Sequence, residues 1–113
     1  MKVAIIGSRN ITVQNIKDYI PEQASILISG GATGIDSCVR SYALAIGIPF
    51  IEILPDYTRY KRAAPLKRNE QIIAQADEVV ALWDGKSHGT QFCIRLCEKT
   101  GKKITVYLLP SQK

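Results

Sequence analysis

Short runs of apolar residues alternate along the chain with segments in which apolar residues recur every three or four positions. The runs are rich in Val and Ile, and most are apolar at successive positions, which is typical of strands buried on both faces of a parallel sheet. We therefore predict five strands, at residues 2–6, 25–29, 49–54, 78–82 and 103–109.

Helical spacing fills the segments between these runs. The apolar positions that define four expected helices are Val13, Ile16 and Ile20; Ile35, Val39, Ala43 and Ile46; Leu66, Ile73 and Ala76; and Cys93, Leu96 and Cys97. Regular alternation of strands and helices predicts a Rossmann-like, three-layer α/β/α fold with a five-stranded parallel sheet in the order 3-2-1-4-5. We expect residues 1–113 to form a single domain, because this length suffices for one hydrophobic core.

Four loops follow strands and should meet at the carboxyl edge of the sheet, where ligands bind in folds of this kind. They are residues 7–12, 30–34, 55–64 and 83–89, and they hold the glycine-rich and basic stretches of the chain. This concentration at one edge predicts a binding site there.

The stretch "SGGATGID" follows the second predicted strand and opens a helix. Gly30 and Gly31 can adopt positive φ, and a glycine turn at a helix N-terminus exposes backbone N–H groups to an anion. Thr33 and Asp36 have the spacing of a capping box, so the alternative is a capped turn without a ligand. The stretch lacks the lysine of a P-loop, and it follows the second strand, whereas the GxGxxG of dinucleotide-binding folds follows the first.

Two further loops carry donors for an anion. "GSRN" places Ser8 and Arg9 after the first strand, and "DGKSHGT" opens the last helix with Ser87 and Thr90. The loop "GSRN" could also be an ordinary turn whose arginine pairs with a nearby acid. The glycine loops "SGGATGID" and "DGKSHGT" are expected to face one cleft, and two such loops together favour a ligand site.

Charge and cysteine content narrow the function classes. The net charge is +5, and five of the cations lie close together: Arg59, Lys61, Arg62, Lys67 and Arg68. They indicate either a solvated surface or a surface for anions and stacked bases, since tyrosines are interleaved. Three cysteines and no signal-peptide or membrane-spanning run predict a cytoplasmic protein without structural disulfides. His88 is the single histidine, so we expect no metal site.

Several stretches resemble a known superfamily. "VAIIGSRNIT", "LISGGATGID" and "RNEQIIA" are similar, in the same order, to signatures of the DNA-processing protein A family, and "DGKSHGT" resembles the GGxGT loop of the Lonely Guy phosphoribohydrolases. Together these define the SLOG superfamily, and "PDYTRYKRAAPLKRN" is most similar to its small, single-domain, nucleotide-binding members.

The resemblance implies a nucleotide-type ligand at the carboxyl edge, no further cofactor, and a homodimer that pairs through helix faces. The ligand-binding residues that we predict are Gly7, Ser8, Arg9, Gly30, Gly31, Thr33, Asp36, Asp56, Arg68, Asn69, Gly85, Ser87, Gly89 and Thr90. Asp36 is expected to cap its helix or to hold a ribose hydroxyl.

We therefore expect a sensor or carrier of a nucleotide-derived phosphorylated ligand, related to ADP-ribose or NAD, rather than an enzyme. One alternative is hydrolysis of the N-glycosidic bond of nucleoside monophosphates. The hydrolases carry a glutamate soon after their Gly-Thr. Here the first carboxylate after Gly89-Thr90 is Glu98, about two helical turns away and too far along the helix to reach the same ligand, so Asp36, Asp56 or Asp84 would have to replace the glutamate. A second alternative is binding of single-stranded nucleic acid by the basic cluster.

Overall fold

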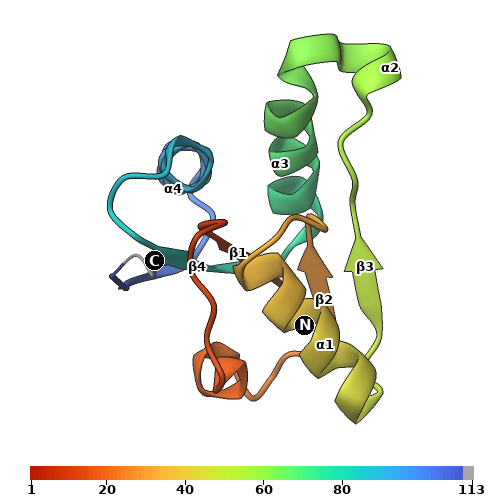
Figure 1. Cartoon of the computed structure of the whole chain (residues 1–113), viewed down its shortest axis with the longest axis vertical. Helices are drawn as coiled ribbons and strands as arrows, with labels where there is room; N and C mark the ends of the chain where they lie inside the picture. Colours follow the sequence, from red (N-terminus) through yellow and green to blue (C-terminus); the bar gives the residue numbers. More distant parts are fainter. Residues whose placement is uncertain (111–113) are drawn as a thin grey trace.

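The computed structural model describes residues 1–110 and contains one parallel sheet (Figure 1). Its five strands lie in the predicted order 3-2-1-4-5. They are β1 (Lys2–Gly7), β2 (Ile26–Ser29), β3 (Phe50–Glu52), β4 (Glu78–Trp83) and β5 (Ile104–Leu108). The predicted Rossmann-like architecture is confirmed, and the last three residues of the predicted domain, 111–113, lie outside the described part.

Side chains of the central strands alternate between two hydrophobic cores, one on each face of the sheet. On β1, Val3 and Ile5 join one core, whereas Ala4 and Ile6 join the other. All four are at most 5% exposed. Burial on both faces explains why the strand is apolar at successive positions instead of alternating with polar residues.

Three long helices cover the two faces. The helix α1 (Ile35–Ile46) packs on one face, and α3 (Ala64–Gln75) and α4 (His88–Thr100) pack on the other. A shorter helix, α2 (Tyr57–Tyr60), and the 3-10 turn η2 (Lys61–Ala63) lie between β3 and α3. Figure 1 shows them at the tip of the molecule, beyond the end of β3.

The prediction of a first helix, from Val13, Ile16 and Ile20, is wrong. The segment between β1 and β2 contains only a single 3-10 turn, η1 (Ile16–Tyr19), which begins without a side-chain cap. Ile16 is buried in the core, and so is Ile11, which lies outside the helical spacing. Two buried side chains can attach a loop to the core just as they can attach a helix. The spacing of a few apolar residues therefore did not require a continuous helix.

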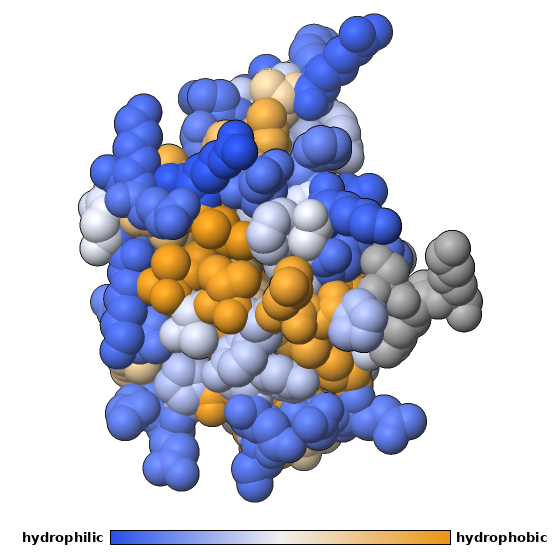
Figure 2. Space-filling view, turned by 90° about the vertical axis from the view of Figure 1, so that its left-hand side faces the viewer, coloured by the Kyte–Doolittle hydropathy of each residue, from blue (hydrophilic) through white to orange (hydrophobic). Residues whose placement is uncertain are grey.

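The two edge strands are less buried than the sequence indicates. On β5, Val106 is 41% exposed and Leu108 is 70% exposed, because no strand pairs beyond β5 within residues 1–110. Figure 2 faces the side of the molecule where α4 and β5 lie and shows apolar areas on that surface. Within the same residues, no helix combines the length and the apolar character needed to cross a bilayer.

Candidate functional site

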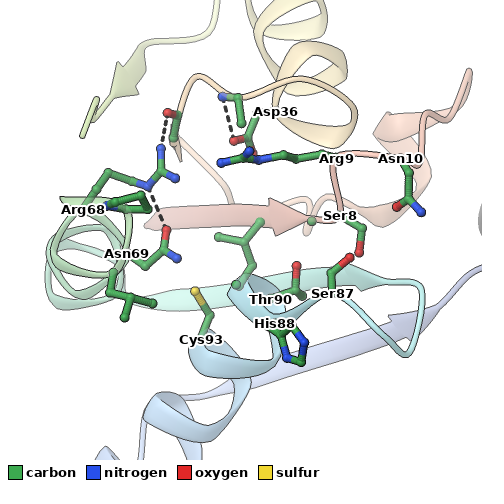
Figure 3. A pocket seen from close by; sticks show the side chains of 17 residues that line it. Ser8, Arg9, Asn10, Asp36, Arg68, Asn69, Ser87, His88, Thr90 and Cys93 are labelled. Carbon is green, nitrogen blue, oxygen red and sulfur yellow. Dashed lines mark hydrogen bonds between the residues drawn. The ribbon is translucent and has the colours of Figure 1, made fainter. Parts of the chain in front are cut away.

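A cavity of about 480 Å³ lies at the carboxyl ends of β1, β2 and β4 (Figure 3). We call it the main cavity. Glycine-containing loops, cationic side chains and ends of helices all contribute to its lining. The lining residues are Ile6, Gly7, Ser8, Arg9, Asn10, Gly30, Ala32, Asp36, Pro65, Leu66, Arg68, Asn69, Ser87, His88, Gly89, Thr90 and Cys93. The carboxyl edge is where sequence reasoning expected a ligand, at the point where the strand order reverses.

Most of the predicted binding residues line this cavity. They are Gly7, Ser8, Arg9, Gly30, Asp36, Arg68, Asn69, Ser87, Gly89 and Thr90. A smaller adjoining hollow of about 260 Å³, which we call the side hollow, is lined by Arg9, Gly30, Gly31, Ala32, Thr33, Pro55, Tyr57 and Arg68. Gly31 and Thr33 therefore belong to the side hollow only.

Asp56 and Gly85 line neither space. The Asp56 carboxylate accepts a hydrogen bond of 3.1 Å from the backbone N–H of Arg59 and so caps α2. Gly85 belongs to the turn that precedes α4, and a Cβ added there would lie 3.3 Å from Leu108 Cδ1. Both residues shape the loops around the site without facing it.

Arg68 is a buried cation at the edge of the main cavity. Only 7% of the residue is exposed, although it lies in the second turn of α3. Its Nε donates to Asn69 Oδ1 at 2.8 Å, and its Nη1 donates to the backbone carbonyl of Gly30 (Figure 3). In residues 1–110 no carboxylate lies within ion-pair distance of Arg68, and these two hydrogen bonds leave Nη2 for another acceptor.

Gly30 makes room for this cation. A Cβ at position 30 would lie 2.6 Å from Arg68 Nη1, closer than two such atoms can approach. The sequence suggested that Gly30 allows a ligand to approach the backbone, whereas in the structure the neighbour that needs the space is the guanidinium. Of the two glycines expected to allow a positive φ, Gly31 adopts one and Gly30 does not; Gly34 adopts one as well.

Asp36 does not form the predicted capping box with Thr33. Its Oδ2 accepts from the backbone N–H of Ala32 at 3.0 Å, and its Oδ1 accepts from the hydroxyl of Ser29 at 2.9 Å. The N-cap of α1 is Gly34, and no side chain caps it. The Ser29 hydroxyl at the end of β2 is a buried hydrogen-bond partner, so the Asp36 carboxylate links this strand to the loop that contains Ala32.

The Asp36 carboxyl is 7% exposed as a residue and faces the main cavity. Burial raises its pKa above the ordinary value, while the two hydrogen bonds act in the opposite direction. The positive charges of Arg68 and Arg9 also lower it, but burial dominates. The group therefore takes up a proton more readily than an exposed aspartate does.

The N-terminus of α4 forms the opposite wall of the cavity. Ser87 is its N-cap and makes no side-chain capping bond, and the N–H of Gln91 is the first to enter the helical ladder, on the carbonyl of Ser87. The N–H groups before Gln91 precede that ladder, and they carry the positive end of the helix dipole. A Cβ at Gly89 would meet only Asn69 Nδ2, at 4.0 Å, so this turn is open toward the cavity.

Asp84 fixes the loop that leads into α4. Its Oδ1 accepts from the backbone N–H groups of Lys86 and Ser87, at 2.8 Å each, and its Oδ2 accepts from the Ser87 hydroxyl at 3.1 Å. Although desolvation opposes it, these hydrogen bonds hold the pKa of Asp84 well below its ordinary value. The backbone N–H of Asp84 in turn donates to the buried Ser8 hydroxyl at 3.2 Å, which joins this loop to the loop after β1.

Sequence reasoning missed several lining residues. Leu66 was placed on the core face of its helix but is 43% exposed and lines the cavity, and His88 was considered only as a metal ligand. Cys93 was correctly placed on the buried face of α4, yet it also reaches the cavity, and burial raises the pKa of its thiol to about 12. An i, i+3 spacing defines a face of a helix but not what that face meets.

Residues 1–110 contain no group of three His, Cys, Asp or Glu side chains that could hold a metal ion. Comparison of the chain with protein-family models, with curated proteins and with solved structures finds no match. The chemistry of the cavity itself is therefore the basis for a function.

Proposed function

We propose that the main cavity binds a nucleotide or nucleotide-derived phosphorylated ligand, and that the protein acts as a sensor or carrier of it. The observation that carries this proposal is the burial of Arg68 with no carboxylate within ion-pair distance in residues 1–110, beside a cavity whose other wall is the N-terminus of α4. Both features attract a negative charge from opposite sides of one space.

Electrostatics favours a ligand at this place. A buried guanidinium loses its hydration, and proteins usually compensate for that cost with an anion close by. Nη2 of Arg68 keeps two N–H groups for such an anion, and a guanidinium binds phosphate oxygens in a fixed geometry. The helix N-terminus adds backbone N–H donors and a dipole of the right sign.

A phosphate explains the site better than a carboxylate substrate does. Hydroxyl donors at Ser8 and Thr90 face the same space, so the cavity offers a cation, hydroxyls and backbone amides for several oxygens. Asp36 also lines this cavity and would repel a phosphate placed directly against it, which favours a neutral hydroxyl, such as that of a ribose, at this position. The similarity to the SLOG superfamily supports the same class of ligand, and we propose membership on that basis.

Hydrolysis of an N-glycosidic bond is the second candidate, and Asp36 is the observation that favours it. Of the three carboxylates considered as replacements for the missing glutamate, only Asp36 lines the cavity; Asp56 caps α2 and Asp84 holds its own loop. A carboxyl with a raised pKa suits a general acid. Release of free base from AMP that disappears in Asp36→Asn would favour this enzyme over a sensor.

Single-stranded nucleic acid is a weaker candidate. Arg59, Lys61, Arg62 and Lys67 are exposed on α2, η2 and the start of α3, so they form a cationic surface beyond the cavity. Binding through them would fall steeply with salt. Fluorescence anisotropy with a labelled oligonucleotide at low and moderate salt tests this surface separately from the cavity.

Calorimetric titration with AMP and with ribose 5-phosphate tests the proposed function. We expect both to bind the wild-type protein and Arg68→Gln to weaken both by roughly tenfold or more, the loss that a charge-assisted hydrogen bond implies. Arg95→Gln is the matched control, because Arg95 is exposed on α4 and lines neither space. The proposal would be contradicted if neither ligand binds the wild type, or if Arg68→Gln binds both ligands as tightly as the wild type does.

Circular dichroism and thermal melting must accompany the titration, since Arg68 also holds Gly30 and Asn69. Arg68→Lys serves as a second variant if Arg68→Gln is unstable, because it keeps the charge and loses the forked geometry. We expect it to fold and to bind with intermediate affinity.

We also propose a cytoplasmic homodimer that pairs through helix faces. Leu44 and Ile46 support this arrangement, since α1 leaves them 74% and 54% exposed. Cys38, Cys93 and Cys97 are free thiols, which suits a reducing compartment. Native mass spectrometry of the wild type and of Leu44→Glu would reveal a dimer and its loss.

A further inference from the structure

The side hollow continues the main cavity toward the tip of the molecule. The two spaces share four lining residues, Arg9, Gly30, Ala32 and Arg68. Ser87, Gly89 and Thr90 line only the main cavity, whereas Tyr57 lines only the side hollow. The spaces therefore adjoin at these residues, and we refer to the two together, from the N-terminus of α4 past the two arginines to Tyr57, as the groove.

Tyr57 presents an aromatic surface at the far end of this groove. It is the first residue of α2 and is 57% exposed, although tyrosine usually buries most of its ring. The Asp56 cap fixes the helix start that carries it. Tyr60, on the same short helix, differs because the Arg59 guanidinium lies over its ring, 5.2 Å from the ring centre, and it lines neither space.

Arg9 stands where the two spaces meet. It is exposed, and in residues 1–110 no carboxylate lies within ion-pair distance of it. Aromatic rings and guanidinium planes are the side-chain surfaces on which nucleobases stack. Pro55, which also lines the side hollow, adds a rigid apolar wall.

We propose, building on the proposed function, that the side hollow holds the planar base of the ligand, stacked on Tyr57 beside Arg9. The order of groups along the groove matches that of a nucleotide. A phosphate would bind between Arg68 and the N-terminus of α4, a ribose hydroxyl would lie at Asp36, and the base would follow beyond Arg9. Tyr57 is then the residue that selects nucleotides over sugar phosphates.

The preference for AMP over ribose 5-phosphate measures this inference apart from the proposed function. The two ligands share ribose and phosphate and differ in the base, so the ratio of their dissociation constants reports what the base contributes. We expect AMP and CMP each to bind the wild type about tenfold tighter than ribose 5-phosphate, since stacking tolerates either base.

Tyr57→Ala should bring this ratio close to one, because it should weaken the binding of AMP and CMP and leave the affinity for ribose 5-phosphate unchanged. Tyr57→Phe should retain the preference, because the ring is kept, and Tyr60→Ala is the matched control on the same helix and should behave as the wild type. Thermal melting checks that all three variants fold.

The outcomes separate the two proposals. Equal affinities of wild type for AMP and ribose 5-phosphate, or a Tyr57→Ala variant that keeps the tenfold preference, would overturn the base site and leave the proposed phosphate site standing. Equal weakening of all three ligands by Tyr57→Ala would show a general role of α2 and would also overturn it. If neither ligand binds the wild type, the proposed function fails and this inference fails with it.

Discussion

The guanidinium of Arg68 donates a hydrogen bond to the backbone carbonyl of Gly30, which lies 38 positions earlier in the chain. The contact joins α3 to the loop after β2 across the edge of the sheet. It also explains the glycine, because a Cβ at position 30 would lie 2.6 Å from Arg68 Nη1 and 3.0 Å from the guanidinium carbon. The cation and the glycine therefore form one unit.

Gly30→Ala should weaken the binding of AMP by moving Arg68. The added methyl group needs the position of Nη1, and the end of a long side chain yields more easily than the sheet does. We expect a loss of affinity similar to that of Arg68→Gln, measured by calorimetry, with the fold retained in circular dichroism spectra.

A double-mutant cycle identifies the cause of that loss. In an Arg68→Gln background, Gly30→Ala should have little further effect on affinity, because the group that it displaces is already gone. Additive losses from the two substitutions would show that Gly30 contributes independently of Arg68, for instance by direct backbone contact with the ligand.

Long-range contacts of this kind could not be predicted from the sequence. "GGATG" and "KRN" each indicated a binding role, and both stretches contribute residues to the lining of the main cavity, but nothing local shows that one residue fills the space left by the other. The same limit applies to the predicted capping box. The Thr33 to Asp36 spacing is a local pattern, whereas the partner that Asp36 binds, Ser29, is brought to it by the start of α1 packing over β2.

The strands were predictable because burial on both faces leaves a direct mark on the sequence, and their order followed from the alternation of strands and helices. β1 and β4 are apolar at successive positions, and in a chain of this length such a run indicates a buried parallel strand. The segment from β1 to β2 was predicted wrongly, since Ile11 and Ile16 bury a loop with only one 3-10 turn. Three apolar residues at helical spacing do not fix the backbone between them.

Gly34→Ala should destabilise the protein more than Gly101→Ala does. Both glycines have a positive φ, at +71° and +74°. Gly101, with ψ of 17°, is in the left-handed helical region, where an alanine costs about 1 kcal/mol, whereas Gly34, with ψ of −125°, lies outside that region in a conformation that side chains adopt even less readily. A Cβ at Gly34 would in addition collide with the backbone oxygen of Arg9, whereas a Cβ at Gly101 meets nothing within 4 Å. Backbone cannot move aside as a side chain can.

Urea denaturation measures the difference. We expect Gly101→Ala to lower the free energy of unfolding by about 1 kcal/mol and Gly34→Ala to lower it by roughly 2–4 kcal/mol, the sum of backbone strain and overpacking. Equal losses in the two variants would contradict a close approach between the loop after β1 and the start of α1.

Asp36→Asn should change the pH dependence of stability. Burial raises the pKa of Asp36 in the folded protein above its value in the unfolded chain, so the folded state binds the proton more tightly. Stability from this group is therefore present at pH values below the unfolded pKa and is lost as the pH rises through the folded pKa. Relative to Asp36→Asn, the wild type should gain stability as the pH falls from about 7 toward about 4, the ordinary pKa of an aspartate.

Chemical denaturation of both proteins across that range provides the test, with the difference between their free energies of unfolding plotted against pH. A difference that stays constant, or that moves against the wild type as the pH falls, would mean that burial does not dominate the titration of Asp36.

Asp84→Asn should have the opposite pH signature. Hydrogen bonds from Ser87 and Lys86 hold the pKa of Asp84 below its unfolded value, so its carboxylate stabilises the folded state above that value, and this contribution is lost as the pH falls through the folded pKa. The variant should be less stable than the wild type at neutral pH, and the gap should narrow below about pH 4, the range in which an unfolded aspartate takes up its proton.

Because the Asp84 turn sets the start of α4, the variant should also bind AMP more weakly at neutral pH. A variant that equals the wild type in both stability and affinity at neutral pH would show that the turn keeps its shape without the carboxylate charge.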